Sequence, residues 1–334
     1  MLRPIALVVL IGLPWAALSE TPPPPQSVQP TAEAPQPDGE PPAQDAAPAD
    51  DGNVLDTTRI YVYDATKWLA SGIDSWFGDR PFEQGGRVAG RIRLGTLWRQ
   101  DEGFDWLTRW GVRVNLPNLR ERGGFLFFGR DNEREVVTDR PDGLTRREQL
   151  LEETRDDQAF FAGLGREVTD ALAFRAGFRG GLKPYAQARY QKRWELGQRN
   201  QVEFRETVFW TLDDRFGSTT ALNADHMFDP SLALRWQSAA TLSQESDGVE
   251  WSSSIGLHKG FGYQRLLSLE ALVSGETEGD VDLSEYGARA RWEQPIYKEW
   301  LLAELIVGHF WPRKESVTER GRAWALGVSV QMLF

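Results

Sequence analysis

The sequence predicts an all-β fold: a transmembrane, antiparallel, up-and-down β-barrel of about 14 strands. From Gly86 onward, apolar residues alternate with small or polar ones, and a period of two is typical of strands. The alternating segments are about ten residues long, the length of a tilted strand that crosses the hydrocarbon layer. The last segment alternates as far as Phe334. A terminal strand stays in place only if it is paired, and closure onto the first strand of a barrel provides that pairing.

The first 19 residues predict a secretory signal peptide. Arg3 precedes an apolar stretch from Ile5 to Trp15, and cleavage is expected after Ser19. The chain is therefore expected to be exported. It contains no cysteine, so it needs no disulfide in an oxidising compartment.

Residues 20–57 predict a disordered, acidic, proline-rich periplasmic linker. They hold many prolines and acids but no lysine or arginine, and such a segment buries too little apolar area to fold. Two interpretations remain open: a solvated spacer, or an arm at residues 20–58 that binds a periplasmic protein.

Residues 58–80 predict a short amphipathic helix that ends near Gly78 and Pro81. Three roles remain open for it: lying in the inner-leaflet interface, plugging the lumen, or packing against the barrel. Its apolar residues recur at helical spacing: Tyr61, Ala65, Trp68, Leu69, Ile73 and Trp76.

The barrel is expected to occupy residues 84–334. An even number of strands is the rule in single-chain bacterial barrels, and 12 strands remain an alternative if the short third and fourth segments are loops. The connection at 131–156 is long and hydrophilic and is expected on the outer side of the membrane, opposite the short periplasmic turns. The predicted strands lie near 86–99, 105–116, 124–130, 157–166, 171–180, 183–194, 201–212, 218–228, 231–243, 249–259, 265–275, 283–294, 300–311 and 322–334.

Tryptophan is abundant, with 14 residues in the chain. Many of them fall at predicted strand ends, where an amphipathic ring can anchor a barrel at the membrane interface. The predicted anchors are Trp98, Trp106, Trp194, Trp210, Trp251, Trp292, Trp300, Trp311 and Trp324.

The export signal, the barrel-length alternating segments and the terminal strand ending in Phe334 resemble those of Gram-negative outer-membrane β-barrel proteins of the porin-like class. The resemblance covers residues 86–334 and identifies no specific family. It implies a location in the outer membrane, among its lipid and lipopolysaccharide, with the N-terminal arm in the periplasm. It also implies that Phe334 belongs to the signal read by the barrel assembly machinery. Fold alone does not fix the activity.

Arginine dominates the predicted inward face, although the whole chain carries a net charge of −11. Guanidinium groups keep their charge and suit carboxylate or phosphate, so a ring of them favours anions in a water-filled barrel. The predicted acidic partners are Glu203, Glu270, Glu285, Glu293 and Glu304. The predicted anion-binding arginines are Arg91, Arg93, Arg109, Arg113, Arg175, Arg189, Arg193, Arg205, Arg235, Arg289 and Arg291.

The inward arginines predict a small anion-preferring pore for small anionic solutes, and resemblance to acidic-sugar porins extends this to oligosaccharides. The alternative is a non-conducting structural or anchoring barrel whose working part is the proline-rich arm, because Arg–Glu ladders also make such barrels rigid. Nucleic-acid binding has no support, since the basic residues form no exposed stripe.

A hydrolase is the second alternative, but the three histidines offer no recognisable catalytic site. Ser254 and His258 share a face yet lie ~13 Å apart along a strand, too far for a nucleophile and its base. Asp225 and His226 point to opposite faces. No cofactor and no metal ion are expected, because no histidine cluster has ligand spacing. Glu206 falls on the outward face, which leaves two readings: a β-bulge or a contact between protomers.

Overall fold

The computed structural model describes residues 54–74, 86–115, 124–145, 150, 158–246, 248–262, 264–279, 281–313 and 319–334. The predicted signal peptide and residues 20–53 of the predicted linker lie outside these ranges. Residues 54–57, which were assigned to the linker, belong to a helix instead. That helix, α1, spans Val54–Asp74 and so begins four residues before the predicted start at 58, while residues 75–80 of the predicted helix lie outside the described ranges.

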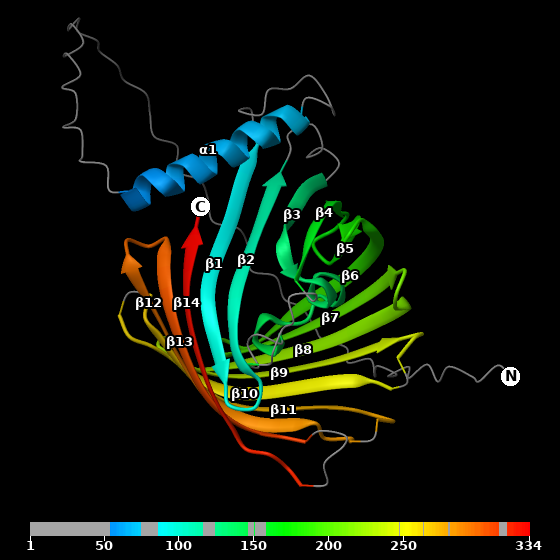
Figure 1. The fold of residues 1–334 in the computed structure, drawn as a ribbon, viewed down its shortest axis with the longest axis vertical. Helices are drawn as coiled ribbons and strands as arrows, with labels where there is room; N and C mark the ends of the chain where they lie inside the picture. Colours follow the sequence, from blue (N-terminus) through cyan, green and yellow to red (C-terminus); the bar gives the residue numbers. More distant parts are fainter. Residues whose placement is uncertain are drawn as a thin grey trace, which may run out of the picture. The chain divides into compact units, whose positions relative to one another are not determined.

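Within the described residues, fourteen antiparallel strands form one closed barrel, in which each strand pairs with its sequence neighbours and β1 pairs with β14 (Figure 1). The predicted fold class is confirmed. The 12-strand alternative is wrong, because the short third and fourth strands both pair in register. The strands are β1 (Arg87–Arg99), β2 (Gly103–Asn115), β3 (Gly124–Asn132), β4 (Gln158–Glu167), β5 (Leu172–Arg179), β6 (Lys183–Leu196), β7 (Asn200–Thr211), β8 (Arg215–Asp229), β9 (Leu232–Ser243), β10 (Glu250–Gly260), β11 (Leu266–Glu276), β12 (Glu285–Tyr297), β13 (Leu301–Pro312) and β14 (Ala323–Leu333).

The outer face of the barrel is apolar, as the alternation predicts. On β14 every second residue is buried, and the exposed ones are Trp324, Leu326, Val328 and Val330. A protein in water would bury this face, whereas in a bilayer it is the face that meets lipid. No helix in the described part of the chain has the length and apolarity to span a bilayer.

Most of the predicted tryptophan anchors lie on this outer face, with Trp98, Trp106, Trp194 and Trp324 exposed. Their role at the membrane interface stays a prediction. Trp300 is an exception. It lies in the turn before β13 beside Arg59 of α1, and it is only 7% exposed, so it is covered by the protein itself and not displayed on the outer face.

The barrel closes where β14 meets β1. The backbone N–H of Gly90 donates to the carbonyl of Phe334 at 2.9 Å, and the N–H of Phe334 donates back at 3.0 Å. A Cβ on Gly90 would lie 2.2 Å from the Phe334 ring, so the last aromatic ring lies directly over this glycine. The terminal strand is thus held to its last residue by the first strand.

Helix α1 contacts the barrel where β12, β13 and β14 end or begin. Asp56 accepts hydrogen bonds from the Tyr297 hydroxyl at 2.6 Å and from the Lys298 ammonium at 2.7 Å. Arg59 donates through Nε to the carbonyl of Leu333 at 3.1 Å, and its guanidinium lies 5.6 Å from the centre of the Trp300 ring. Trp300 therefore serves as a platform for α1.

The chain after β3 folds into the lumen, an arrangement that the sequence analysis did not predict for the connection at 131–156. We call residues 133–145 together with Leu150 the inward segment. It contains helix α3 (Glu133–Thr138) and the 3-10 turn η2 (Asp142–Leu144). Its buried apolar residues are Val137, Leu144 and Leu150, each no more than 1% exposed.

Candidate functional site in the barrel lumen

Local sequence signals start and stop helix α3. The Asn132 side chain caps its N-terminus by accepting from the backbone N–H groups of Arg134 and Glu135 at 3.0 and 3.2 Å. The helix ends at Asp139, whose φ of 52° lies in the left-handed region and whose N–H donates to the Glu135 carbonyl. Aspartate tolerates this conformation because its short polar side chain finds local partners. The chain therefore turns sharply at Asp139, inside the lumen.

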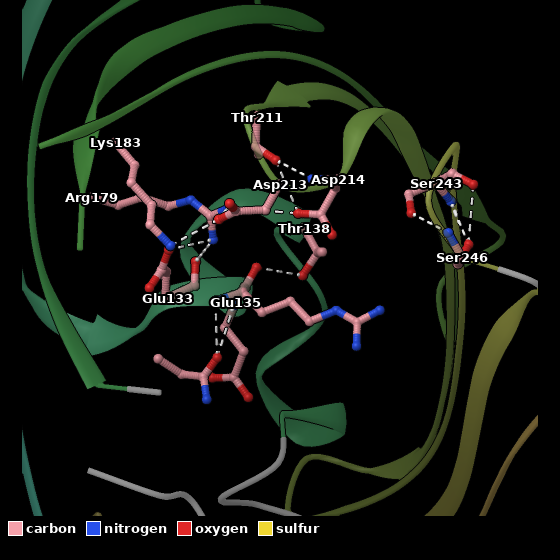
Figure 2. Close-up of polar contacts among 12 residues, drawn as sticks. Glu133, Glu135, Thr138, Arg179, Lys183, Thr211, Asp213, Asp214, Ser243 and Ser246 are labelled. Atoms are coloured by element: carbon pink, nitrogen blue, oxygen red, sulfur yellow. Dashed lines mark hydrogen bonds and ion pairs between the residues drawn. The ribbon is translucent and has the colours of Figure 1, made fainter. Parts of the chain in front are cut away.

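Two basic side chains of the wall hold the first turn of α3. Figure 2 shows Arg179 and Lys183 converging on Glu133, with Nη1 of Arg179 3.3 Å and Nζ of Lys183 3.6 Å from its carboxylate. Arg179 also donates to the Glu133 carbonyl at 3.0 Å. Asp213 and Asp214 lie on the other side of Arg179, at 3.7 and 3.5 Å. Negative charge in the first turn of a helix is stabilised by the helix dipole, and these cations add to that effect.

Apolar side chains carry the segment across the lumen. Val137 packs with Tyr185 and Phe209 on β6 and β7. Further along, Leu144 packs with alanines of β8 and β9, and Leu150 packs with residues of β11, β13 and β14 that include Phe310. The segment is thus anchored on opposite sides of the barrel and divides the lumen.

Asp139 lies among three arginines of β5, β6 and β7. Its carboxylate is 3.7 Å from Nη1 of Arg175, 3.2 Å from Nη1 of Arg189 and 3.4 Å from Nη1 of Arg205. All four side chains are mostly buried, with exposures between 15% and 24%. Three predicted anion-binding residues therefore converge on one carboxylate that belongs to the protein itself.

The far half of the segment is tied to β9, β10 and β12. Arg140 pairs with Glu250 at 2.8 Å and donates to the Thr241 hydroxyl at 3.1 Å. Arg289, itself paired with Glu270, donates to the carbonyl of Gly143 at 3.0 Å. A Cβ on Gly143 would come within 2.2 Å of Oε1 of Gln237, so a larger residue here would push that side chain aside.

Two arginines on β1 and β2 fasten the ends of the segment. Arg109 lies 3.2 Å from Asp131 and 3.3 Å from Glu135. Arg99 is 1% exposed, forms ion pairs with Glu285 and with Asp101, and donates to the Leu150 carbonyl at 3.1 Å.

Most of the other predicted lumen residues form ion pairs along the wall, which leaves fewer free cations than the alternation implies. Arg93 donates to the Gln331 amide at 2.8 Å. Arg91 is exposed and forms no ion pair with the described residues. The remaining pairs are Arg113 with Glu167 at 2.5 Å, Arg193 with Glu203 at 2.8 Å, Arg235 with Asp225 at 2.6 Å and Arg291 with Glu304 at 3.9 Å.

The sequence reasoning missed the acids that the inward segment and its anchors contribute, because hydrophilic loops are ordinarily solvated. One signal could have found the segment: aliphatic residues recur within an otherwise charged loop, and an exposed loop has no use for them. The missed residues are Asp131, Glu133, Glu135, Asp139 and Glu250 at the segment and its anchors, and Glu167 and Asp225 on the wall strands β4 and β8.

A cavity of about 360 Å³ lies between the inward segment and the wall. Its wall side holds Arg91, Arg93 and Arg291, and its segment side holds Glu135, Asp139 and Asp142. Phe127, Phe161 and Tyr185 add aromatic surface. The lining therefore combines arginines and carboxylates with aromatic faces, which suits a small charged solute.

A serine and a histidine meet across two neighbouring strands, which a search along single strands could not detect. His258 Nδ1 lies 2.9 Å from the Ser268 hydroxyl, and its Nε2 lies 3.7 Å from Glu270. Ser268 is 1% exposed, however, and Glu270 is engaged by Arg289. The hydroxyl does not reach the open lumen, so this group gives a hydrolase no support.

No protein-family model and no curated protein matches the chain. Solved structures do share its architecture. The outer membrane channel DcaP of Acinetobacter baumannii is 9% identical with a TM-score of 0.45, covering 75% of this chain and 97% of its own. OmpT of Vibrio cholerae is 10% identical with a TM-score of 0.40 over the same shares. The KdgM porin, solved with oligogalacturonate, is 8% identical with a TM-score of 0.35, covering 73% and 99%.

The chain folds as a closed, antiparallel β-barrel. Identities this low describe architecture alone, so any activity has to be argued from the lumen of this barrel.

Proposed function

We propose that the chain forms a narrow outer-membrane channel for small anionic solutes. The observation that carries the proposal is the cavity between the inward segment and the arginine-bearing wall. A barrel of this strand number is wide enough for a passage, since eight strands are filled by side chains while sixteen hold an aqueous channel. The inward segment narrows that passage and lines one side of it with charge.

The preference for anions comes from local excesses of positive charge. The cavity lining holds equal numbers of arginines and acidic residues. At Asp139, however, three arginines face one carboxylate, and on β1 the exposed Arg91 forms no ion pair with the described residues. An anion crossing the lumen would meet the Asp139 cluster and Arg91, which lower the cost of its partial dehydration.

Aromatic surface beside the arginines extends the solute range to acidic sugars. Phe127 lies under Arg175, with the guanidinium 5.7 Å from the ring centre, and Phe161 and Tyr185 line the same space. Rings of this kind present flat apolar faces to a sugar, while the arginines are suited to its carboxylate.

The end of the barrel that carries α1 is proposed to face the periplasm. The turns at that end are short, for example those after Leu196 and Asp229, whereas the long connections lie at the opposite end. Short turns are periplasmic and long loops extracellular in outer-membrane barrels. The N-terminal arm would then also be periplasmic, where it could bind a partner protein.

A non-conducting barrel is the second candidate, and one observation favours it. The inward segment is fixed to opposite walls by ion pairs and buried side chains, which is what a rigid plug requires. In that case the proline-rich arm would be the working part of the protein.

Single-channel recording on the refolded full-length chain separates the two candidates. A conducting barrel should show steps with anion preference, measured as the reversal potential in a KCl gradient. Arg91→Glu should lower the anion-to-cation permeability ratio roughly fivefold, the effect of about 1 kcal/mol on a passing ion.

Arg199→Glu, in the exposed turn between β6 and β7, is the matched control and should leave the ratio unchanged. Absence of conductance in the folded protein would favour the plug. Equal effects of the two substitutions would contradict the role of Arg91.

A further inference from the structure

The Asp139 cluster holds more hydrogen-bond donors than one carboxylate can use. Arg175, Arg189 and Arg205 each approach it through a single terminal nitrogen, and none forms a two-point pair. Nε of Arg205 and the hydroxyl of Tyr185 are buried and make no hydrogen bond within the described residues. Tyr185 is 2% exposed and lines the cavity together with Arg175 and Asp139.

These surplus donors distinguish the cluster from the ordinary ion pairs of the wall. Arg193 with Glu203 and Arg235 with Asp225 set one cation against one anion on adjacent strands. At Asp139, three cations from three consecutive strands face one anion that comes from a different element, the inward segment. A net positive, mostly buried pocket with unused donors is an anion site.

Asp139 reaches the pocket only because the chain turns there. Its left-handed backbone conformation ends α3 and directs the carboxylate at the arginines. The carboxylate is therefore carried by a segment that joins two strands, whereas its partners belong to the rigid barrel. A solute carboxylate could replace it without disturbing the wall.

We propose that Arg175, Arg189, Arg205 and Tyr185 form a binding site for the carboxylate group of a solute. Asp139 is the built-in competitor that fills the site in the absence of solute. The inference rests on the proposed function in one respect, which is that anions enter the lumen. Competition of this kind weakens solute binding and so favours release, which a channel needs. It also couples occupancy of the site to the position of the inward segment.

The test compares two variants that change the same charge in the same segment. Asp139→Asn removes the competing carboxylate and keeps the turn, because asparagine also adopts the left-handed region. Asp142→Asn is the control, since Asp142 is exposed, lines the same cavity, and has a carboxylate that forms no hydrogen bond or ion pair with the described residues. The probe is succinate, titrated by calorimetry into the folded full-length chain in detergent.

Succinate should bind Asp139→Asn roughly tenfold more tightly than the unsubstituted chain, because the internal competitor is gone. The affinity of Asp142→Asn for succinate should stay within about twofold of that of the unsubstituted chain, since this substitution changes only the long-range electrostatic field. Adding Arg189→Gln to Asp139→Asn should abolish the gain. Equal gains in the two single variants, or no gain at all, would overturn the proposal.

Two further arms complete the experiment. The affinity for inorganic phosphate should increase less than the affinity for succinate in Asp139→Asn. An equal or larger increase for phosphate would overturn the assignment to carboxylates. Should Asp139→Asn fail to fold, Arg189→Gln alone must weaken succinate binding while Arg215→Gln, an exposed arginine at the start of β8, does not. Bilayer conductance is recorded separately. If the chain conducts anions but Asp139→Asn does not bind succinate more tightly, the proposed function stands and the proposed carboxylate site is overturned.

Discussion

Arg99 shows how a single residue joins distant parts of this barrel. It lies at the end of β1, pairs with Glu285 on β12, reaches the Leu150 carbonyl of the inward segment and lies over the Phe310 ring at 5.0 Å. Its side chain is 1% exposed and that of Glu285 10%. Charges buried to this degree are stable only as a pair.

Removing one partner of this pair should therefore cost more than removing both. We expect Arg99→Leu to lower the free energy of unfolding by about 3–5 kcal/mol, since it leaves Glu285 buried and uncompensated. The double variant Arg99→Leu/Glu285→Leu should recover at least about 1 kcal/mol of that loss. Equilibrium unfolding in lipid vesicles measures both, and a double variant less stable than the single one would contradict this account.

Glu206 is the one acidic residue that the alternation places in the middle of the outer face. The register is regular there, with Glu206 opposite Tyr190 on β6 and Thr220 on β8, so the bulge suggested from the sequence is wrong. Its carboxylate accepts a hydrogen bond from the Thr220 hydroxyl at 2.6 Å. A polar pair of this kind is costly beside lipid.

If this pair faces lipid, substitutions at its two residues should change the free energy of unfolding in opposite directions. We expect Glu206→Leu to raise the free energy of unfolding by about 1 kcal/mol, while Thr220→Val lowers it by leaving the carboxylate without its donor. Unfolding in vesicles measures both. A loss of stability in Glu206→Leu that accompanies a change from oligomer to monomer would instead establish a protomer contact.

At the scale of elements, helix α1 is held to the rim by charges that titrate. The hydrogen bond from Lys298 is the main cause that holds the pKa of Asp56 below its ordinary value of 3.8, with the Tyr297 hydroxyl adding to it. The same contact raises the pKa of Lys298 above its ordinary 10.5. Both groups are solvent-accessible, so the effect concerns docking of the helix and not the stability of the barrel.

The docking should fail at both ends of the pH range. The Asp56 contribution is present above pH 3.8 and is lost as the pH falls through the depressed pKa. The Lys298 contribution is present below pH 10.5 and is lost as the pH rises through the raised pKa. Hydrogen exchange of the α1 amides should accelerate outside this pH window. In Asp56→Asn the acceleration at low pH should be absent. Unchanged exchange in that variant would contradict the assignment.

The elements differ in how far the sequence could predict them. Alternation located all strands of the described barrel, because one face meets lipid and a one-residue slip would expose polar groups to it. The inward segment could not be placed in the same way, since its contacts join residues more than 30 positions apart, such as Asp139 and Arg175. The arginines of the site could be predicted from the alternation of inward and outward side chains along each strand, while the carboxylate that they bind could not. The burial of Trp300 could not be predicted either, because it lies in a turn and is covered through its contact with Arg59 of α1.

For the whole molecule, closure depends on the last residue. Phe334 makes both backbone hydrogen bonds to Gly90 and packs against the cluster of Val112 and Val114. A barrel without this closure would expose unpaired backbone groups to lipid.

Removing only the ring should weaken the closed barrel. We expect Phe334→Ala to lower the free energy of unfolding by about 2 kcal/mol and to reduce the yield of folded barrel in cells. Val330→Ala, on the same face of β14, is the control and should cost about 1 kcal/mol or less. Equal losses from the two substitutions would show that the terminal ring has no special part in closure.

The contact between Arg59 and the Leu333 carbonyl has a mechanical consequence. It fastens the helix that begins the described chain to the strand that ends it, close to where the barrel closes. A pulling load applied to the chain ahead of Val54 would therefore meet two links in turn, first Asp56 at the end of β12 and then Arg59 at the end of β14. Through the second of these links, tension on the N-terminal arm reaches the strand that closes the barrel wall.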